Sequence, residues 1–177
     1  DYSLVSKSGH GIISGYSGDG TKQTWGVMPD YYESFGSGSG AFQGESPDSV
    51  KWDFKSRKQD VVVINLGTND YSYTGKDEAK CEEYKLAYIE FVKRVRKLNP
   101  DAKIICALGI MGDELYPTVE AVVEEYKADT KDENIAAFHF KPQSADDGYG
   151  ADWHPSAATH EKAAAELAEF IKDSMGW

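Results

Sequence analysis

The most constraining feature of the sequence is a run of apolar, mostly β-branched residues from Asp60 to Leu66, D-V-V-V-I-N-L, which ends at Gly67. A strand with one face in water alternates apolar and polar residues, and this run does not alternate. Continuous runs of this length are typical of strands that are covered on both faces, as in a parallel sheet between helices. The run therefore predicts a central strand of an α/β fold.

Helices and further strands alternate along the rest of the chain, as a parallel sheet with helical connections requires. Apolar residues recur at helical spacing over Asp77–Leu98, and its acidic start and basic end complement the helix dipole. We also expect strands at Tyr2–Ser6, Lys103–Leu108 and Ile135–Phe140, and helices at Thr118–Lys127 and Ser156–Lys172, the last with an inner stripe of His160, Ala164, Leu167 and Ile171. The predicted fold is a single three-layer αβα domain with a central parallel sheet, flavodoxin-like in strand order.

The net charge of the chain argues against two classes of binding partner. The chain has 19 Lys and Arg residues against 30 Asp and Glu residues, a net charge of −11. Because this charge repels phosphate backbones and anionic lipid, we expect neither nucleic acid nor a membrane surface as a partner. No apolar run approaches about 18 residues, so no membrane span is expected. No leader follows Asp1, and we expect the true start of the chain to lie upstream of it.

No metal or cofactor is expected from the residue pattern. Cys81 and Cys106 lack the spacing of metal ligands and are interpreted as packing thiols. The acidic residues Asp146, Asp147 and Asp152 lack the regular ligand spacing of a calcium loop, which favours a solvated loop.

Glycine and polar residues follow the predicted strands, where ligands bind in α/β folds. Gly9 and Gly11 follow the first strand, Asn69 follows the central strand, and His154 lies just before the last helix. An imidazole can accept and return a proton near neutral pH, and a carboxamide beside a glycine N–H can stabilise an oxyanion. The plain alternatives are a surface histidine and ordinary turn residues.

Three blocks carry a family resemblance. They are S-G-H-G at Ser8–Gly11, N-L-G-T-N-D at Asn65–Asp70 and D-W-H-P-S at Asp152–Ser156. In order and spacing they resemble the SGNH branch of the GDSL hydrolases, and most closely carbohydrate esterase family two, acetyl esterases that act on plant-wall polysaccharides. The resemblance implies an SGNH-hydrolase architecture, an acetylated polysaccharide or oligosaccharide substrate, no cofactor and an extracellular or cell-surface location.

The resemblance also assigns roles to residues. It implies that Gly11 and Asn69 supply the oxyanion hole, with Gly9 as the alternative glycine donor, and that His154 is the general base. It further implies that Trp153 stands at the wall of the substrate cleft, where its indole can stack on a sugar face. From their positions next to Asn69 in the chain, Asp70 and Tyr71 are also expected to contact the substrate. For Tyr71, packing in the protein interior is the alternative.

The chain departs from the family in lacking a nucleophile block. The family serine lies in a G-D-S block at the end of the strand before the first strand of this chain, and no G-D-S occurs here. A parallel crossover needs about a dozen residues or more, so that serine is expected at least this far upstream of Asp1. Residues 1–177 are therefore expected to be an SGNH hydrolase domain without its first strand and helix. Ser17, in G-Y-S-G, has no helix pattern after it and is interpreted as a loop serine.

A second departure concerns the group that orients His154. Many relatives have Asp three residues before the histidine, where this chain has Ala151, whereas Asp152 is only two residues before it. Asp152 is thus a candidate third member of a triad, and a backbone carbonyl is the alternative.

Two other functions remain open from the sequence. The aromatic residues can make the same cleft a polysaccharide-binding module of a larger enzyme. A hydrolase of lipid esters or thioesters is the third hypothesis, although the expected rim is polar and aromatic rather than aliphatic.

Overall fold

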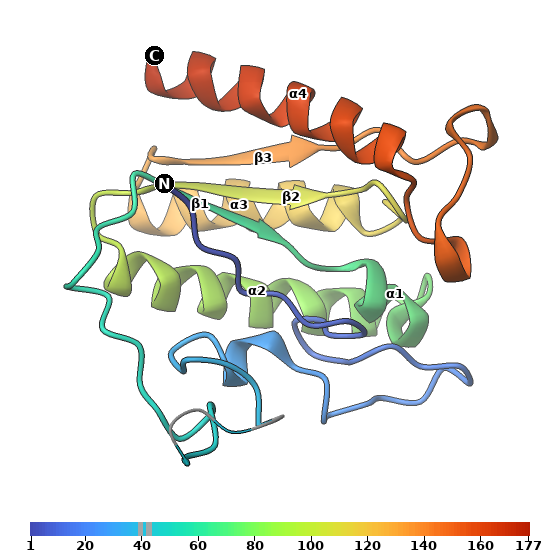
Figure 1. Cartoon of the computed structure of the whole chain (residues 1–177), viewed down its shortest axis with the longest axis horizontal. Helices are drawn as coiled ribbons and strands as arrows, with labels where there is room; N and C mark the ends of the chain where they lie inside the picture. Colours follow the sequence, from blue (N-terminus) through green and yellow to red (C-terminus); the bar gives the residue numbers. More distant parts are fainter. Residues whose placement is uncertain (39–40, 42–43) are drawn as a thin grey trace.

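The computed structural model describes residues 1–38, 41 and 44–177. It contains a sheet of parallel strands, with order β1-β2-β3 (Figure 1). These strands are β1 (Val61–Asn65), β2 (Lys103–Leu108) and β3 (Ile135–His139). Register places Val63 beside Ile105 and Ile105 beside Ala136. The parallel sheet predicted from the apolar runs is confirmed.

Helices cover both faces of this sheet (Figure 1). One face carries α2 (Glu78–Leu98) and α3 (Tyr116–Thr130), and the opposite face carries α4 (Ala157–Met175). The shorter elements are α1 (Thr68–Thr74) and the 3-10 turns η1 (Met28–Asp30), η2 (Ala145–Asp147) and η3 (Ala151–Trp153). The three-layer αβα class is therefore confirmed.

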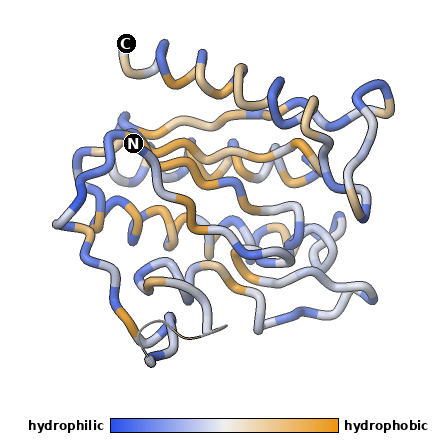
Figure 2. The backbone as a smooth tube through the Cα atoms, viewed as in Figure 1, coloured by the Kyte–Doolittle hydropathy of each residue, from blue (hydrophilic) through white to orange (hydrophobic). Residues whose placement is uncertain are grey.

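Two hydrophobic cores lie on the two faces of the sheet. The larger one joins Ile104 and Cys106 of β2 to Tyr84 and Tyr88 of α2 and to apolar residues of α3. The smaller one joins Ile105 and Ala107 of β2, among others, to the inner side of α4. Figure 2 shows the apolar stretches in the strands and along the inner sides of the helices. Because successive side chains of β2 enter opposite cores, the continuous apolar run over Lys103–Leu108 is explained.

Side chains at two helix starts fix where these helices begin. The Asp77 carboxylate accepts the N–H groups of Ala79 and Lys80 at 3.0 and 3.1 Å, so α2 begins at Glu78. The Ser156 hydroxyl accepts the Thr159 N–H at 3.2 Å at the start of α4. Both are N-cap contacts, in which a side-chain oxygen satisfies an otherwise unpaired helix N–H.

The structure corrects the prediction of a strand at Tyr2–Ser6. These residues form no strand, and Tyr2 and Leu4 are 82% and 81% exposed. No neighbouring strand pairs with them among the described residues. An apolar extended segment without a hydrogen-bonded neighbour is not a strand, whatever its β-propensity.

The inner stripe of α4 differs from the predicted one at its amino end. Thr159 and Ala163 are buried, whereas His160 is exposed. The two stripes converge at Leu167 and Ile171, which both pack on the smaller core. At this end the Thr159 N–H is bound by the Ser156 hydroxyl, and the Thr159 residue lies on the buried side of the helix.

The cysteines agree with their interpretation as packing thiols, since Cys106 is buried, Cys81 is half-buried and both are free. Within the described ranges, the helices include none with the length and apolar character needed to cross a bilayer.

Candidate active site

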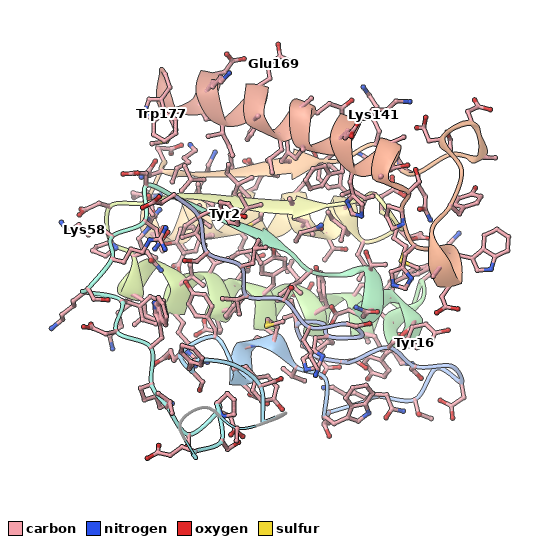
Figure 3. The ribbon with its side chains drawn as sticks, in the orientation of Figure 1. Tyr2, Tyr16, Lys58, Lys141, Glu169 and Trp177 are labelled. Atoms are coloured by element: carbon pink, nitrogen blue, oxygen red, sulfur yellow. The ribbon has the colours of Figure 1, made fainter. Side chains whose placement is uncertain are left out.

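The loops that carry the three sequence blocks lie at one edge of the sheet. The carboxyl ends of β1, β2 and β3 point to the same side of the molecule, where α1, η3 and the Ser8–Gly11 loop are found (Figure 1). Figure 3 labels Tyr16 at this side, and its N–H donates to the Gly9 carbonyl at 2.8 Å. The structure therefore brings the loops of Asn69 and His154 to a common edge.

Hydrogen bonds connect these loops to one another. Thr68 Oγ1, at the start of α1, donates to the carbonyl of Gly112 in the loop after β2 at 3.1 Å. The carbonyl of Ile110, in the same loop, accepts the N–H of Gln143 at 2.6 Å. Gln143 Nε2 then donates to the Trp153 carbonyl at 2.8 Å. The edge is thus held by contacts that run from β1 to the His154 loop.

Gly11 does not have a free N–H. Its N–H donates to the Gly26 carbonyl at 2.8 Å, and its carbonyl accepts the Met28 N–H at 2.8 Å. A Cβ at this position would lie 2.4 Å from the Asp70 carboxylate, so glycine is required for packing. The expectation that Gly11 donates to an oxyanion is therefore corrected: this N–H is already used inside the protein.

Gly9 has the free N–H that Gly11 lacks. Among the described residues no hydrogen bond uses the Gly9 N–H. Its φ of +74° is left-handed, a conformation that glycine adopts without strain. The alternative glycine donor is therefore the one that the geometry supports.

Asn69 lies in the first turn of α1, beside the Ser8–Gly11 loop. Gly67, just before the helix, has φ +145°, and a Cβ there would lie 2.7 Å from Tyr84 Oη. Asn69 Nδ2 donates to the His10 carbonyl at 2.8 Å. Because a carboxamide NH₂ has two hydrogens, one remains for a ligand. This contact holds the carboxamide next to the segment that contains the Gly9 N–H.

Asp70 is not at the substrate-facing rim, and that expectation is corrected. It is fully buried, and its carboxylate accepts the N–H groups of Ile12, Ile13 and Ser14 at 2.8 to 3.1 Å. Burial raises the pKa of the Asp70 carboxyl, and the N–H bonds from Ile13, Ile12 and Ser14 oppose this rise. Asp70 therefore positions the loop that follows Gly11 instead of contacting a ligand.

The tyrosines after Asp70 are engaged within the protein. Tyr71 is half-buried and packs against the larger core. Tyr73 Oη donates to the Glu83 carboxylate at 3.3 Å, and the Lys80 ammonium lies 4.4 Å from its ring centre. For Tyr71, the packing alternative fits this geometry better than a contact with substrate.

His154 is exposed, and one of its nitrogens is held by the backbone. Its Nδ1 lies 3.0 Å from the Ala151 carbonyl oxygen. A carbonyl can only accept, so Nδ1 carries the hydrogen and Nε2 has the lone pair. Within the described residues no hydrogen bond reaches Nε2. The imidazole is therefore in the tautomer that a general base needs.

Among the described residues, the imidazole of His154 is hydrogen-bonded to the Ala151 carbonyl and forms no hydrogen bond or ion pair with Asp152. It adopts φ 50° and ψ 40° inside η3, and Trp153 also has a positive φ, of 62°. Two successive left-handed residues other than glycine are unusual and strained. The turn is closed by the Gly150 N–H, which donates to the His154 carbonyl at 2.7 Å. Of the two candidate orienting groups, the carbonyl of Ala151 is the one that the geometry supports.

An exposed pair of aromatic rings accompanies His154. Trp153 is 72% exposed and Tyr149 is 43% exposed. Their ring centres lie 5.2 Å apart, with planes inclined by 59°. Flat aromatic faces of this kind are suited to packing against sugar rings.

Among the described residues no serine makes a hydrogen bond to the His154 side chain. Ser17 is buried in a loop, where its hydroxyl donates to Asp19 at 3.0 Å and its N–H donates to Ser72 at 2.8 Å. The interpretation of Ser17 as a loop serine agrees with this environment. The described part of the chain also contains no cluster of His, Cys, Asp and Glu side chains that could hold a metal ion.

One polar cluster near this edge has no counterpart in the sequence interpretation. His139, at the end of β3, stacks on Tyr116 with ring centres 3.9 Å apart, and its Nε2 lies 2.7 Å from Asp113 Oδ2. His139 is exposed but paired. Its partners follow a different strand, so local sequence patterns carry no signal for the contact.

The sequence is similar to known esterases. It matches the GDSL-like lipase/acylhydrolase family over residues 4–162. It is 39% identical over 132 residues to the cellulase/esterase CelE of Acetivibrio thermocellus, covering 72% of this chain and 16% of CelE. It is 27% identical over 177 residues to an acetylxylan esterase/glucomannan deacetylase of Cellvibrio japonicus, covering 98% of this chain and 44% of the relative.

The fold matches solved esterase structures. An acetyl xylan esterase from Butyrivibrio proteoclasticus aligns over 96% of this chain and 50% of its own, with a TM-score of 0.84 and 26% identity. A family two carbohydrate esterase from Clostridium thermocellum, in complex with cellohexaose, aligns over 96% of this chain and 48% of its own, with a TM-score of 0.75 and 32% identity. The chain spans about half the length of these two proteins and of the Cellvibrio relative. With its fold, its three blocks and these matches, the chain belongs to the GDSL-like lipase/acylhydrolase family, and family two carbohydrate esterases are among its relatives.

Proposed function

We propose that residues 1–177 form the greater part of the catalytic domain of a carbohydrate acetyl esterase, which removes O-acetyl groups from plant-wall polysaccharide. The serine nucleophile is supplied by polypeptide outside these residues. The names of the relatives support this class of substrate, since they include an acetylxylan esterase/glucomannan deacetylase and an acetyl xylan esterase. Such substrates lie outside cells, so we also propose an extracellular or cell-surface location.

The proposed base is His154. Its Nε2 takes the proton from the serine hydroxyl as the serine oxygen attacks the acetyl carbonyl carbon. The Ala151 carbonyl, 3.0 Å from Nδ1, keeps the hydrogen on the other nitrogen and so leaves Nε2 free to accept. The imidazolium then returns the proton to the sugar oxygen as the ester bond breaks, which leaves an acetyl-serine.

The proposed oxyanion donors are the Asn69 carboxamide and the Gly9 N–H. Both are neutral donors on segments that a hydrogen bond of 2.8 Å, from Asn69 to the His10 carbonyl, holds together. Fixed donors stabilise negative charge that appears on the carbonyl oxygen only in the transition state. The same donors serve the second half of the reaction, in which His154 takes a proton from water as the water oxygen attacks the acetyl carbon. The imidazolium then returns this proton to the serine oxygen as the acyl–serine bond breaks and acetate leaves.

The observation that carries this proposal is the contact between His154 Nδ1 and the Ala151 carbonyl, because it prepares a base at the edge that also holds Asn69. The test joins a strand and helix with a G-D-S block to residue 1 and measures acetate release from acetylated glucomannan. His154→Ala should lower kcat by about 10²–10⁴-fold. His160→Ala removes another exposed histidine, on α4, and should leave kcat unchanged. Undiminished turnover by the His154→Ala protein would refute the proposal.

A second candidate function is polysaccharide binding without catalysis. The exposed pair of Trp153 and Tyr149 favours it, since a stacking platform needs no nucleophile. On a glucan affinity gel, retention that survives His154→Ala and disappears with Trp153→Ala would support a binding module. A third candidate, hydrolysis of lipid esters or thioesters, predicts faster turnover of long-chain than of acetyl esters of 4-nitrophenol.

A further inference from the structure

Gln143 connects two of the loops at the edge of the candidate site. It follows Pro142 in the segment that leaves the carboxyl end of β3. Its backbone N–H donates to the Ile110 carbonyl at 2.6 Å, and its side-chain Nε2 donates to the Trp153 carbonyl at 2.8 Å. One residue therefore joins the loop after β2 to the turn that carries His154.

The turn of His154 depends on this connection. Among the described residues, the other hydrogen bonds of residues 149–155 have both partners inside that range. They join Gly150 to His154, Ala151 to His154 and, as an isolated bridge, Tyr149 to Pro155. Within the part of the chain that the structure describes, the Gln143 side chain is therefore the hydrogen-bonded link from this turn to the rest of the domain.

Two strained backbone segments meet at Gln143. Ile110 has φ 71°, and Asp152 and Trp153 have φ 50° and 62°, so all three are left-handed residues other than glycine. This conformation is especially unfavourable for a β-branched residue such as Ile110. It persists only where the surrounding contacts hold it. Because Gln143 binds the carbonyls of Ile110 and Trp153, it holds both strained segments at once.

The peptide group between Trp153 and His154 is held on both sides. Its carbonyl accepts from Gln143 Nε2 at 2.8 Å, and its N–H donates to the Ala151 carbonyl at 3.0 Å. The same Ala151 oxygen accepts the imidazole Nδ1–H at 3.0 Å, and a carbonyl oxygen has two lone pairs for these two donors. Since the orientation of this peptide plane sets the direction of the His154 side chain, the Gln143 carboxamide acts on the ring without touching it.

The oxygen of the Gln143 carboxamide is in an unfavourable environment. Oε1 is buried and has no hydrogen-bond partner among the described residues. A buried oxygen without a partner destabilises a fold, and an apolar side chain of the same length would remove this penalty. Stability therefore does not favour glutamine here, whereas donation to the Trp153 carbonyl requires a group such as its NH₂.

We propose that Gln143 is a positioning residue for His154. Its NH₂ group fixes the Trp153–His154 peptide, so that the Nδ1 hydrogen stays on the Ala151 carbonyl and Nε2 keeps its lone pair. The importance of this for turnover rests on the proposed function, in which His154 is the base. Without the Gln143 donor the ring can turn away from Ala151, and either nitrogen can then carry the hydrogen.

The first test observes the His154 ring itself and needs no nucleophile. In the 177-residue chain labelled with ¹⁵N-histidine, nuclear magnetic resonance at pH 8 distinguishes a ring nitrogen that carries hydrogen from one that does not. The His154 signals are assigned by their loss in His154→Ala. The parent should show hydrogen on Nδ1 alone. Gln143→Met should show both nitrogens shifted toward the average of the two tautomers.

A second variant separates the donor from the size of the side chain. Gln143→Met keeps the length and removes the donor, whereas Gln143→Glu keeps the shape and replaces the NH₂ group by an oxygen that is ionised at pH 8. Both variants should lose the single tautomer. A normal tautomer in Gln143→Glu but not in Gln143→Met would show that size alone matters and would overturn the proposal.

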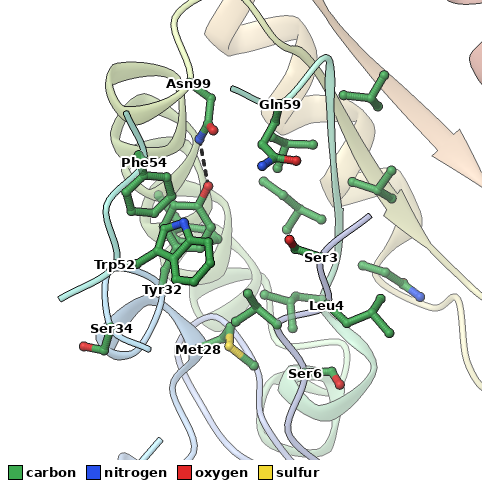
Figure 4. Close-up of a pocket in the computed structure, with 18 of the residues that line it drawn as sticks. Ser3, Leu4, Ser6, Met28, Tyr32, Ser34, Trp52, Phe54, Gln59 and Asn99 are labelled. Atoms are coloured by element: carbon green, nitrogen blue, oxygen red, sulfur yellow. Dashed lines mark hydrogen bonds between the residues drawn. The ribbon is translucent and has the colours of Figure 1, made fainter. Parts of the chain in front are cut away.

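Gln59 offers a matched control at the other end of β1. Its Nε2 also donates to a backbone carbonyl, that of Arg57 at 3.3 Å, and it is half-buried like Gln143. It lies before the amino end of β1, in the lining of a cavity of about 450 Å³ (Figure 4). Gln59→Met should therefore leave the His154 signals unchanged. An equal change of these signals in Gln59→Met would contradict a specific role of Gln143.

Thermal unfolding distinguishes a positioning role from a purely structural one. Because Gln143→Met removes the buried oxygen without a partner, its unfolding midpoint should equal or exceed that of the parent. A loss of the single tautomer that comes with a large fall in the midpoint would show general loosening of the fold and would overturn the proposal.

The kinetic test supplies the nucleophile, as for the proposed function, and measures acetate release. Gln143→Met should lower kcat by about 10- to 100-fold and leave KM within about threefold, because a displaced base acts on the chemical step. Gln59→Met should keep both values. A fall in kcat with an unchanged His154 tautomer overturns the proposed route through the ring. Loss of the tautomer with full turnover supports the positioning role and counts against His154 as the base, so the two proposals can fail separately.

Discussion

The carboxylate of Asp70 accepts the backbone N–H of Ile13 at 2.8 Å, across 57 residues of sequence. The same carboxylate also accepts the N–H groups of Ile12 and Ser14. Successive N–H groups that converge on one anion form a compact nest, which fixes the backbone around it. Through this contact the start of α1 determines the shape of the loop that contains Gly11.

Asp70→Ala should destabilise the fold strongly. The substitution leaves buried N–H groups of Ile12, Ile13 and Ser14 without an acceptor, and we expect a loss of about 3 kcal/mol in the free energy of unfolding. Urea titration followed by tryptophan fluorescence measures it. Asp146→Ala, in the exposed turn η2, is the matched control and should change stability little. Similar stabilities for the two variants would contradict the anchoring role.

The pH dependence of stability should reveal the same carboxyl. Burial raises the pKa of Asp70 from the ordinary value of 3.8, so above this pH the folded protein holds a proton that the unfolded chain has released. The contribution of this bound proton to the free energy of unfolding is complete below pH 3.8. It is lost as the pH rises through the pKa of Asp70 in the folded protein. Asp70→Asn cannot titrate, so the stability of the parent relative to this variant should fall from pH 4 upward. If the stability of the parent relative to Asp70→Asn stays constant or increases from pH 4 upward, the raised pKa of Asp70 is contradicted.

Asp152→Asn should leave catalysis nearly intact once the nucleophile is supplied. The imidazole is oriented by the Ala151 carbonyl, and the left-handed conformation of residue 152 suits Asn as well as Asp. We expect kcat within about threefold of the parent, whereas loss of a true triad aspartate costs about 10⁴-fold. Steady-state kinetics with 4-nitrophenyl acetate distinguish these results, and the larger loss would restore Asp152 to the catalytic group.

Asn69→Ala should reduce turnover more than substrate affinity. A donor that acts on the transition state alone affects kcat and kcat/KM alike, and removal of one such donor costs about 10²–10³-fold. The measurement is kcat and KM on acetylated glucomannan with the nucleophile supplied. Because Asn69 also holds the His10 carbonyl, unfolding by urea provides the control for a structural effect. A rise in KM at constant kcat would argue for substrate binding instead.

Cys106 should resist alkylation until the protein unfolds. Burial raises the pKa of its thiol to about 12, against a small opposing contribution from Tyr88, and the residue is 0% exposed. At pH 8 the thiolate fraction is therefore about one in 10⁴. In a Cys81→Ser background, iodoacetamide should label Cys106 in urea and not in buffer. Rapid labelling of the native protein would show that the larger core opens locally.

The sequence predicted the parts of the fold that depend on local pattern. The run over β1 identified a strand of the parallel sheet, but β1 lies at the edge of the described sheet and not in its middle, and Val63 is 38% exposed. The spacing over α2 placed that helix to within a residue. α1 was not foreseen because T-N-D-Y-S-Y-T consists mainly of weak helix formers. Tyr2–Ser6 was wrongly predicted as a strand because strand formation depends on a neighbour that local sequence does not show.

The residues of the candidate site also divide into those that local sequence predicts and those that depend on distant contacts. His154 and Asn69 were identified from their positions after strands, and the structure places the elements that carry them, η3 and α1, at one edge of the sheet (Figure 1). The choice of glycine and the role of Asp70 could not be predicted, since both depend on contacts with distant residues, such as Gly26 for Gly11 and Ile12 for Asp70. Whether these residues catalyse ester hydrolysis stays a prediction.

The left-handed turn at Asp152 and Trp153 has a consequence for how the His154 ring responds to substitutions around it. Since a main-chain oxygen holds the ring, replacing nearby acids does not detach it, and charge on the surrounding surface is free to vary. Inserting or deleting a single residue between Gly150 and Pro155 would instead rotate the ring away from its partners. The Nδ1 contact therefore depends on the length of this short loop more than on its acidity.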